Sequence, residues 1–62
     1  MRHSALRLKR ILVLGIRLST GINIIRKDVC REFEISERTF FRDIEILRDV
    51  LNVHENNGVY SR

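Results

Sequence analysis

The chain has 62 residues, 44% of them hydrophobic, which is enough for one small domain with a modest core. Twelve Lys and Arg against eight Asp and Glu give a formal net charge of +4, which favours an anionic partner without naming it. A chain of this length can scarcely enclose a substrate pocket, and it has no nucleophile elbow, phosphate-binding glycine loop or spaced carboxylate pair. We therefore expect a protein that is not an enzyme.

Cysteine and histidine are too few and too dispersed for a metal site. Cys30 is the single cysteine, and His3 and His54 lie in other parts of the chain, so we predict no metal and no cofactor. A lone cysteine cannot form an intramolecular disulfide, which favours a reducing, cytoplasmic location. The apolar run 6–18 is interrupted by four cations and is shorter than the roughly 20 residues of a membrane span, so no membrane association is expected.

The charges are distributed unevenly along the chain. All seven charges from Arg2 to Lys27 are positive, whereas residues 28–62 carry eight acidic and five basic side chains. A basic first part of the chain can bind phosphates, while the second part, with charges of both signs, can form the fold and distinguish one binding partner from another.

Residues 4–19 are predicted as a first helix, with Ser4 as its N-cap and Thr20-Gly21 ending it. Gly15, inside this helix, costs roughly 1 kcal/mol relative to Ala, which indicates close packing against another backbone. At about 100° per residue, one side of the helix is expected to face the core. That side carries Leu8, Ile11, Leu12, Leu14, Gly15 and Leu18.

A second helix is predicted over residues 27–33, with Val29, Cys30 and Phe33 on one face. The turn that follows, Phe33-Glu34-Ile35, has two apolar anchors around one polar residue. Helix-turn-helix units commonly have glycine at this left-handed position, and a residue such as Glu34 costs of order 1 kcal/mol there.

A third helix is predicted over residues 37–50, with Ser36 as its cap. Arg38 and Arg42 lie one turn apart on its outward side. A guanidinium can donate to two acceptors on a guanine edge or clamp a phosphate, so the front half is expected to approach DNA. Glu45 and Asp49 continue the same line toward the rear, where Glu45 has Arg42 or Arg48 as an alternative ion-pair partner. The buried stripe is expected to consist of Phe40, Ile44, Leu47 and Leu51.

Residues 52–61 are predicted to form a β-hairpin. Val53-His54-Glu55 and Val59-Tyr60-Ser61 are predicted strands, and the Asn-Gly pair in Asn56-Asn57-Gly58 is typical of a tight hairpin tip. The β-branched run at 23–25 is expected to pair with this hairpin as a third strand.

The stretch from Phe33 to Thr39, followed by Arg42-Asp43-Ile44-Glu45 and Leu47-Arg48, resembles the N-terminal winged helix-turn-helix of bacterial DeoR-type and WYL-type transcriptional regulators. The resemblance extends from Leu8 to Tyr60. It implies a mainly α (small α+β) fold, namely a three-helix winged helix-turn-helix with a short C-terminal β-hairpin wing, as one domain over residues 1–62. It also implies a bacterial or phage-encoded protein. Those regulators continue into a long ligand-sensing or oligomerising domain, whereas this chain stops after the wing, so no small-molecule effector is expected. A small stand-alone regulator and a relic of a longer one both stay open.

The expected function is sequence-specific binding of double-stranded DNA by a small transcriptional regulator, with the helix that begins at Ser36 in the major groove. Two alternatives stay open, a winged-helix protein–protein interaction module and an excisionase-like architectural DNA-binding protein. Four of the candidate DNA contacts also have a purely structural alternative. Ser36 can cap the third helix, and Phe41 can lie at the edge of the core. Arg48 can pair with Glu45, and Tyr60 can pack within the hairpin. The candidate DNA contacts are Arg26, Lys27, Ser36, Glu37, Arg38, Thr39, Phe41, Arg42, Arg48, Asn57 and Tyr60.

A homodimer is expected, because one recognition helix offers few base contacts and specific sites usually contain two half-sites. Leu6 and Val13 lie opposite the core side of the first helix, and a single core cannot bury both sides. We predict that these two residues, together with Ile46 on the third helix, form the dimer interface.

Overall fold

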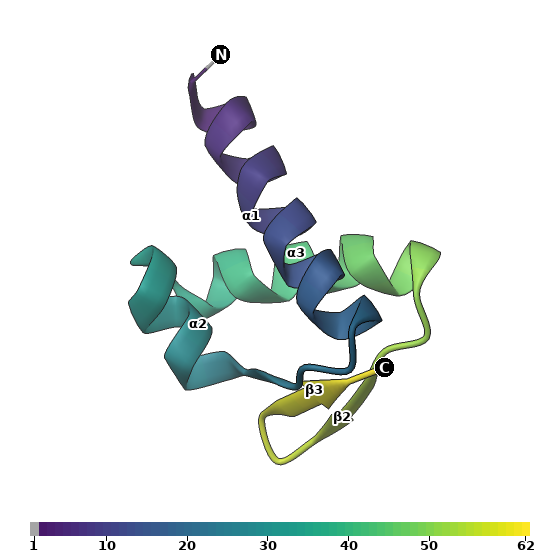
Figure 1. Cartoon of the computed structure of the whole chain (residues 1–62). Coiled ribbons are helices and arrows are strands. Elements are labelled where there is room, and N and C mark those ends of the chain that lie inside the picture. Colours follow the sequence, from purple (N-terminus) through teal and green to yellow (C-terminus); the bar gives the residue numbers. More distant parts are fainter. Residues whose placement is uncertain (1) are drawn as a thin grey trace.

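The computed structural model describes the backbone of residues 2–62 and the side chains of residues 6–62. Within that range the chain forms three helices and a small antiparallel sheet, as Figure 1 shows. This is the mainly α, winged helix-turn-helix arrangement that the sequence predicts. In chain order the elements are α1 (Arg2–Ser19), β1 (Ile24–Ile25), α2 (Arg26–Phe33), α3 (Glu37–Val50), β2 (His54–Asn56) and β3 (Val59–Ser61).

Helix α1 begins at Arg2, two residues earlier than predicted. Ser4 therefore lies within the helix, and the prediction that it is the N-cap is wrong. Helix α1 ends at a glycine whose backbone is in the left-handed conformation. Gly21 has φ 88°, and its N–H donates to Leu18 O at 3.1 Å while the next N–H, from Ile22, donates to the carbonyl of Arg17 at 2.8 Å. These two bonds satisfy carbonyls that the last turn leaves free, so the predicted stop at Thr20-Gly21 is confirmed.

The turn between α2 and α3 has the predicted left-handed residue. Glu34 has φ 52° and ψ 50°, and the following N–H, from Ile35, donates to Cys30 O at 3.0 Å. Ser36 caps α3, since its side chain accepts the N–H of Thr39 at 3.2 Å. The short connection therefore sets α3 across α2, as a helix-turn-helix requires.

The sheet has the strand order β1-β3-β2, with Ile24 opposite Tyr60 and Asn56 opposite Val59. Its hairpin closes through Asn57-Gly58, which have φ 53° and 82°. Positive φ at both central residues is the geometry of a type I′ turn, for which an Asn-Gly pair is favoured. The predicted wing and its third strand are confirmed.

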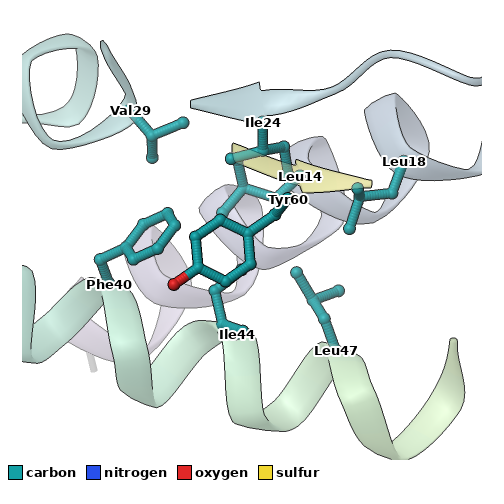
Figure 2. Close-up of a cluster of buried hydrophobic side chains, with 8 residues drawn as sticks. All are labelled: Leu14, Leu18, Ile24, Val29, Phe40, Ile44, Leu47 and Tyr60. Carbon is teal, nitrogen blue, oxygen red and sulfur yellow. The ribbon is translucent and has the colours of Figure 1, made fainter. Parts of the chain in front are cut away.

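One cluster of buried side chains holds these elements together. Figure 2 shows the α3 residues pointing toward α1 and the sheet, with the ring of Tyr60 among them. Gly15 lets α1 approach α3 closely, because a Cβ there would stand 3.3 Å from a methyl group of Leu47. The close contact is with a side chain and not with another backbone, which corrects the prediction. The cluster consists of Leu14, Leu18, Ile24, Val29, Phe40, Ile44, Leu47 and Tyr60.

The predicted core side of α1 is partly wrong. Leu14 and Leu18 are fully buried, but Leu8 and Leu12 are 59% and 57% exposed. At 100° per residue, Leu8 is rotated about 120° from Leu14, and Leu12 by the same angle from Leu18. The N-terminal turns of α1 also project beyond the rest of the domain (Figure 1).

Candidate nucleic-acid interface

The outward side of α3 presents two arginines in its first half. Arg38 and Arg42 are exposed and one helical turn apart, and among the side chains of residues 6–62 no carboxylate lies within ion-pair distance of either. Glu45 and Asp49 are exposed further along the same line. The alternative in which Glu45 pairs with Arg42 or Arg48 is not observed. Both guanidinium groups of the first half are therefore available to an anionic partner.

The hydroxyl of Ser36 forms hydrogen bonds within the first turn of α3. It accepts the Thr39 N–H and donates to Thr39 Oγ1, both at 3.2 Å. Capping, the alternative given for Ser36, is what the geometry shows. Thr39 is half-buried beside it, whereas Glu37 is exposed at the tip of the helix.

Arg26 joins three elements at the base of the predicted interface. Its backbone N–H donates to Gly58 O in the wing at 2.9 Å. Its Nε lies 3.6 Å from Glu37 Oε2, and its guanidinium stands 5.9 Å from the centre of the Phe41 ring. The Nε atom is buried and lacks a hydrogen bond within the described chain. These contacts make Arg26 a link between α2, α3 and the wing, with only part of the guanidinium left for a phosphate.

Phe41 belongs partly to the core edge. It is 41% exposed, and its ring packs edge-on against Phe40 with centroids 5.8 Å apart. Both roles considered for this side chain are therefore compatible with its position.

A cleft of about 400 Å³ separates α3 from the wing, and Arg48 is exposed along it. The two cations of the cleft are balanced by two carboxylates, so this cleft has no net charge. Its lining consists of Arg26, Phe41, Ile44, Glu45, Arg48, Glu55 and Tyr60.

The two candidate residues of the wing, Asn57 and Tyr60, differ in their exposure to solvent. Asn57 is exposed at the tip, where the carboxylate of Glu55 accepts the Gly58 N–H at 2.9 Å and rigidifies the turn. Tyr60 is only 3% exposed and packs edge-on against Phe40 at 5.2 Å between centroids. Burial and then the charge of Glu55 raise the pKa of the Tyr60 hydroxyl. Tyr60 thus has the packing role given as its alternative, and we leave it out of the interface.

Lys27 is exposed in the first turn of α2, and among residues 6–62 no carboxylate pairs with it. Lys27 and the partly available Arg26 lie in the first turn of α2. The backbone N–H groups of a first turn have no hydrogen-bond partner within the helix and can bind an anion. The candidate interface therefore consists of the start of α2, the outward side of α3 and the wing tip.

Sequence reasoning missed the residue that orients α3, Asp43. Its carboxylate is completely buried and pairs with the guanidinium of Arg10, whose Nη2 donates to Oδ1 at 3.2 Å and whose Nε donates to Oδ2. Arg7 adds a more distant contact of 3.8 Å. Asp43 lies three residues after Phe40 in the buried stripe of α3, and this position is the signal by which it could have been found.

A second ion pair ties α1 to α2 at the surface. Arg17 donates two hydrogen bonds to Glu32, at 2.9 and 2.6 Å, and lies 5.9 Å from the centre of the Phe33 ring. These hydrogen bonds lower the pKa of the Glu32 carboxyl. Burial raises the pKa of the Cys30 thiol, with a smaller contribution from the negative charge of Glu37 on α3.

Within the part of the chain that the structure describes, no group of three or more His, Cys, Asp or Glu is arranged to hold a metal ion. None of the described helices combines the length and the apolar character needed to span a bilayer. Comparison of the chain with protein-family models, with curated proteins and with solved structures finds no match. The resemblance to DeoR-type and WYL-type regulators therefore stays a prediction.

Proposed function

We propose that the protein is a sequence-specific double-stranded DNA-binding protein, a small transcriptional regulator that inserts α3 into the major groove. The observation that carries the proposal is the exposed pair Arg38 and Arg42 on the outward side of a capped helix. A guanidinium can donate two hydrogen bonds to the O6 and N7 of guanine, or it can clamp a phosphate. Two such groups in the first half of a helix match the end that enters the groove in helix-turn-helix proteins.

The surroundings of the two arginines support the same orientation. Lys27 is exposed at the start of α2 and Asn57 at the tip of the wing, on elements that flank α3. In helix-turn-helix complexes such flanking groups bind the phosphate backbone and fix the register of the recognition helix. Glu45 and Asp49, on the rear half of α3, would be repelled by phosphates, so the front half is the end to be inserted. A cytoplasmic location belongs to the same proposal.

The test is a fluorescence anisotropy titration with random and selected duplexes at two salt concentrations. With about five cationic contacts, the logarithm of the association constant should fall by roughly four to five per tenfold rise in salt. The double variant Arg38→Ala, Arg42→Ala should bind much more weakly. If both arginines bind phosphates, the salt slope should also shrink by about two, whereas loss of a guanine contact costs about 1–3 kcal/mol and relaxes sequence preference.

The matched control removes the same charge elsewhere. Lys9 and Arg31 are exposed and have no ion pair among residues 6–62, so Lys9→Ala, Arg31→Ala changes the net charge equally. We expect this variant to retain sequence preference and most of the affinity. If the folded wild-type protein binds no duplex, or if the two double variants lose affinity equally, α3 is not a DNA-reading helix. A protein-interaction module would then be the better description, and a bending assay on any bound duplex would separate out an architectural role.

A further inference from the structure

An apolar groove of about 510 Å³ lies between α1 and the end of α3. Its floor is at Gly15, where the absence of a side chain lets Leu47 approach. Leu12 and Ile16 on the α1 wall are 57% and 62% exposed, and Val50 on α3 is 73% exposed. Scattered exposed apolar residues are ordinary, but a contiguous set around a groove marks an interaction site. We call this feature the α1–α3 groove.

Lys9 lies just beyond one end of the α1–α3 groove, two residues before the first lining residue, Ile11. Around the helix axis Lys9 is about 20° from Ile16 and about 60° from Leu12, so it shares the exposed apolar side of α1. It is exposed, and among the side chains of residues 6–62 no carboxylate lies within ion-pair distance of it. The other described cations of α1 all pair with carboxylates, namely Arg7, Arg10 and Arg17.

The opposite end of the α1–α3 groove opens into a polar hollow of about 250 Å³, and the two share Val50 as a lining residue. The hollow contains two arginines, Arg48 and Arg62, against the single carboxylate of Asp49. No ion pair joins these groups. Arg62 donates a hydrogen bond to Ser19 O at 3.2 Å, which places its guanidinium at the end of α1 that lines the groove. Both ends of the groove are therefore positively charged.

We propose that the α1–α3 groove binds an acidic amphipathic helix of another protein. Such a helix places apolar side chains, spaced three and four residues apart, into a groove of this kind. Lys9 and Ser19 are ten residues apart, which is a rise of about 15 Å along α1. Carboxylates roughly ten residues apart on the partner would therefore meet the cations at both ends. The partner is thus an apolar stripe of about three turns between two acidic ends.

Charge and shape disfavour three other occupants. Double-stranded DNA presents phosphates and no apolar surface of the kind that fills a groove. A second copy that laid its own α1 along the groove would bring cations against cations, because α1 contains no acidic residue. An anionic bilayer would meet the cations, but its flat surface leaves the concave floor at Gly15 without contacts.

The α1–α3 groove lies away from the proposed DNA-binding side of α3. Around that helix Val50 is rotated about 80° from Arg42 and about 120° from Arg38. The inference does not rest on the proposed function, because the groove and its charges are independent of any DNA. The residues predicted for a homodimer do not line the groove, so a dimer through them stays a separate prediction; they are Leu6, Val13 and Ile46.

Fluorescence anisotropy of the full chain with synthetic helical peptides tests the proposal. The probe is a labelled peptide of about 18 residues with leucines along one side and glutamates at both ends, and a second peptide has lysine at every glutamate position. The groove is small relative to a standard interface of about 800 Å² per partner, so we expect the glutamate peptide to bind with a Kd of about 10–100 μM. The lysine peptide should bind at least about tenfold more weakly, because its charges meet cations.

Substitutions separate the apolar contribution from the charges. Leu12→Gln should weaken binding of the glutamate peptide by about tenfold. Its matched control is Ile22→Gln, which should bind like the wild type because Ile22 is 54% exposed and lies outside the groove. The double variant Lys9→Glu, Arg62→Glu should exchange the preference, so that the lysine peptide binds more tightly. Arg31→Glu, which reverses an exposed charge on α2, should keep the wild-type preference.

A folded wild-type protein that binds neither peptide at about 1 mM overturns the proposal. Equal binding of both peptides, or equal weakening by Leu12→Gln and Ile22→Gln, overturns it as well. Circular dichroism checks the folding of each variant, and Ile16→Gln replaces Leu12→Gln if the latter unfolds.

Two further measurements examine the other occupants. Sedimentation equilibrium reports self-association, and co-sedimentation with phosphatidylglycerol–phosphatidylcholine vesicles reports membrane binding. If Leu12→Gln abolishes either of these while neither peptide binds, a second copy or a membrane occupies the groove and the proposal is wrong. The Arg38→Ala, Arg42→Ala variant should bind the glutamate peptide normally. Failure to bind DNA and failure to bind the peptide are therefore separate results.

Discussion

Replacing Arg10 by Met should destabilise the fold severely, because it removes the main partner of a buried charge. The Asp43 side chain is completely inaccessible to solvent, and that of Arg10 is 13% exposed. Breaking a buried ion pair by removing one partner costs about 3–5 kcal/mol, since the other charge is left uncompensated. Arg7, 3.8 Å away and 43% exposed, can compensate in part, so we expect the low end of this range, about 3 kcal/mol.

A loss of this size is large for such a chain. Domains of this length are stable by roughly 3–9 kcal/mol, and 1 kcal/mol shifts the melting temperature by about 4–8 °C. Arg10→Met should therefore lower the melting temperature by about 12–24 °C, measured by circular dichroism together with urea unfolding at neutral pH. The methionine retains an apolar stem, so lost packing contributes little.

Two comparison variants identify the cause. Adding Asp43→Leu to Arg10→Met removes the unpaired carboxylate, and the double variant should recover to within about 1–2 kcal/mol of the wild type. Arg17→Met breaks an ion pair whose members are 32% and 45% exposed, so it should cost less than about 1 kcal/mol. If Arg10→Met melts within about 5 °C of the wild type, or if the double variant is the least stable of all, the buried pair does not anchor α3 to α1.

Three further predictions concern local features. Ser36→Ala removes the cap of α3 and should cost about 1 kcal/mol in urea unfolding, whereas no change would mean that the bond to Thr39 is dispensable. Glu34→Gly should stabilise the protein by about 1 kcal/mol, because Glu34 has φ 52° and glycine adopts this conformation without strain; a loss of stability would contradict the left-handed turn. The hydrogen bonds from Arg17 lower the pKa of Glu32 in the folded protein below its ordinary value of 4.5. The ionised Glu32 therefore contributes stability above pH 4.5, and this contribution is lost as the pH falls through the folded pKa. Arg17→Met should flatten this part of the acid-unfolding profile, and an identical profile would remove Glu32 from the explanation.

The local sequence determined the helices, the turn and the wing of this protein. The stripe from Phe40 to Leu47, the cap at Ser36 and the Asn57-Gly58 pair each act over a few residues, so spacing and residue type are sufficient to predict them. The outward position of Arg38 and Arg42 follows from the same periodicity, since they lie opposite the stripe. The candidate interface on α3 was therefore predictable.

Only the tertiary structure decided which side of α1 is covered and how α3 is held. Leucine, isoleucine and valine surround most of α1, so its sequence admits more than one core side, and the crossing of α3 and the sheet selects Leu14 and Leu18 while leaving Leu8 and Leu12 exposed. The pairing of Arg10 with Asp43 joins residues 33 positions apart, and it arises because the fold buries both between α1 and α3. Periodicity reports the direction of a side chain around its own helix, but the neighbour that meets it depends on how distant segments pack.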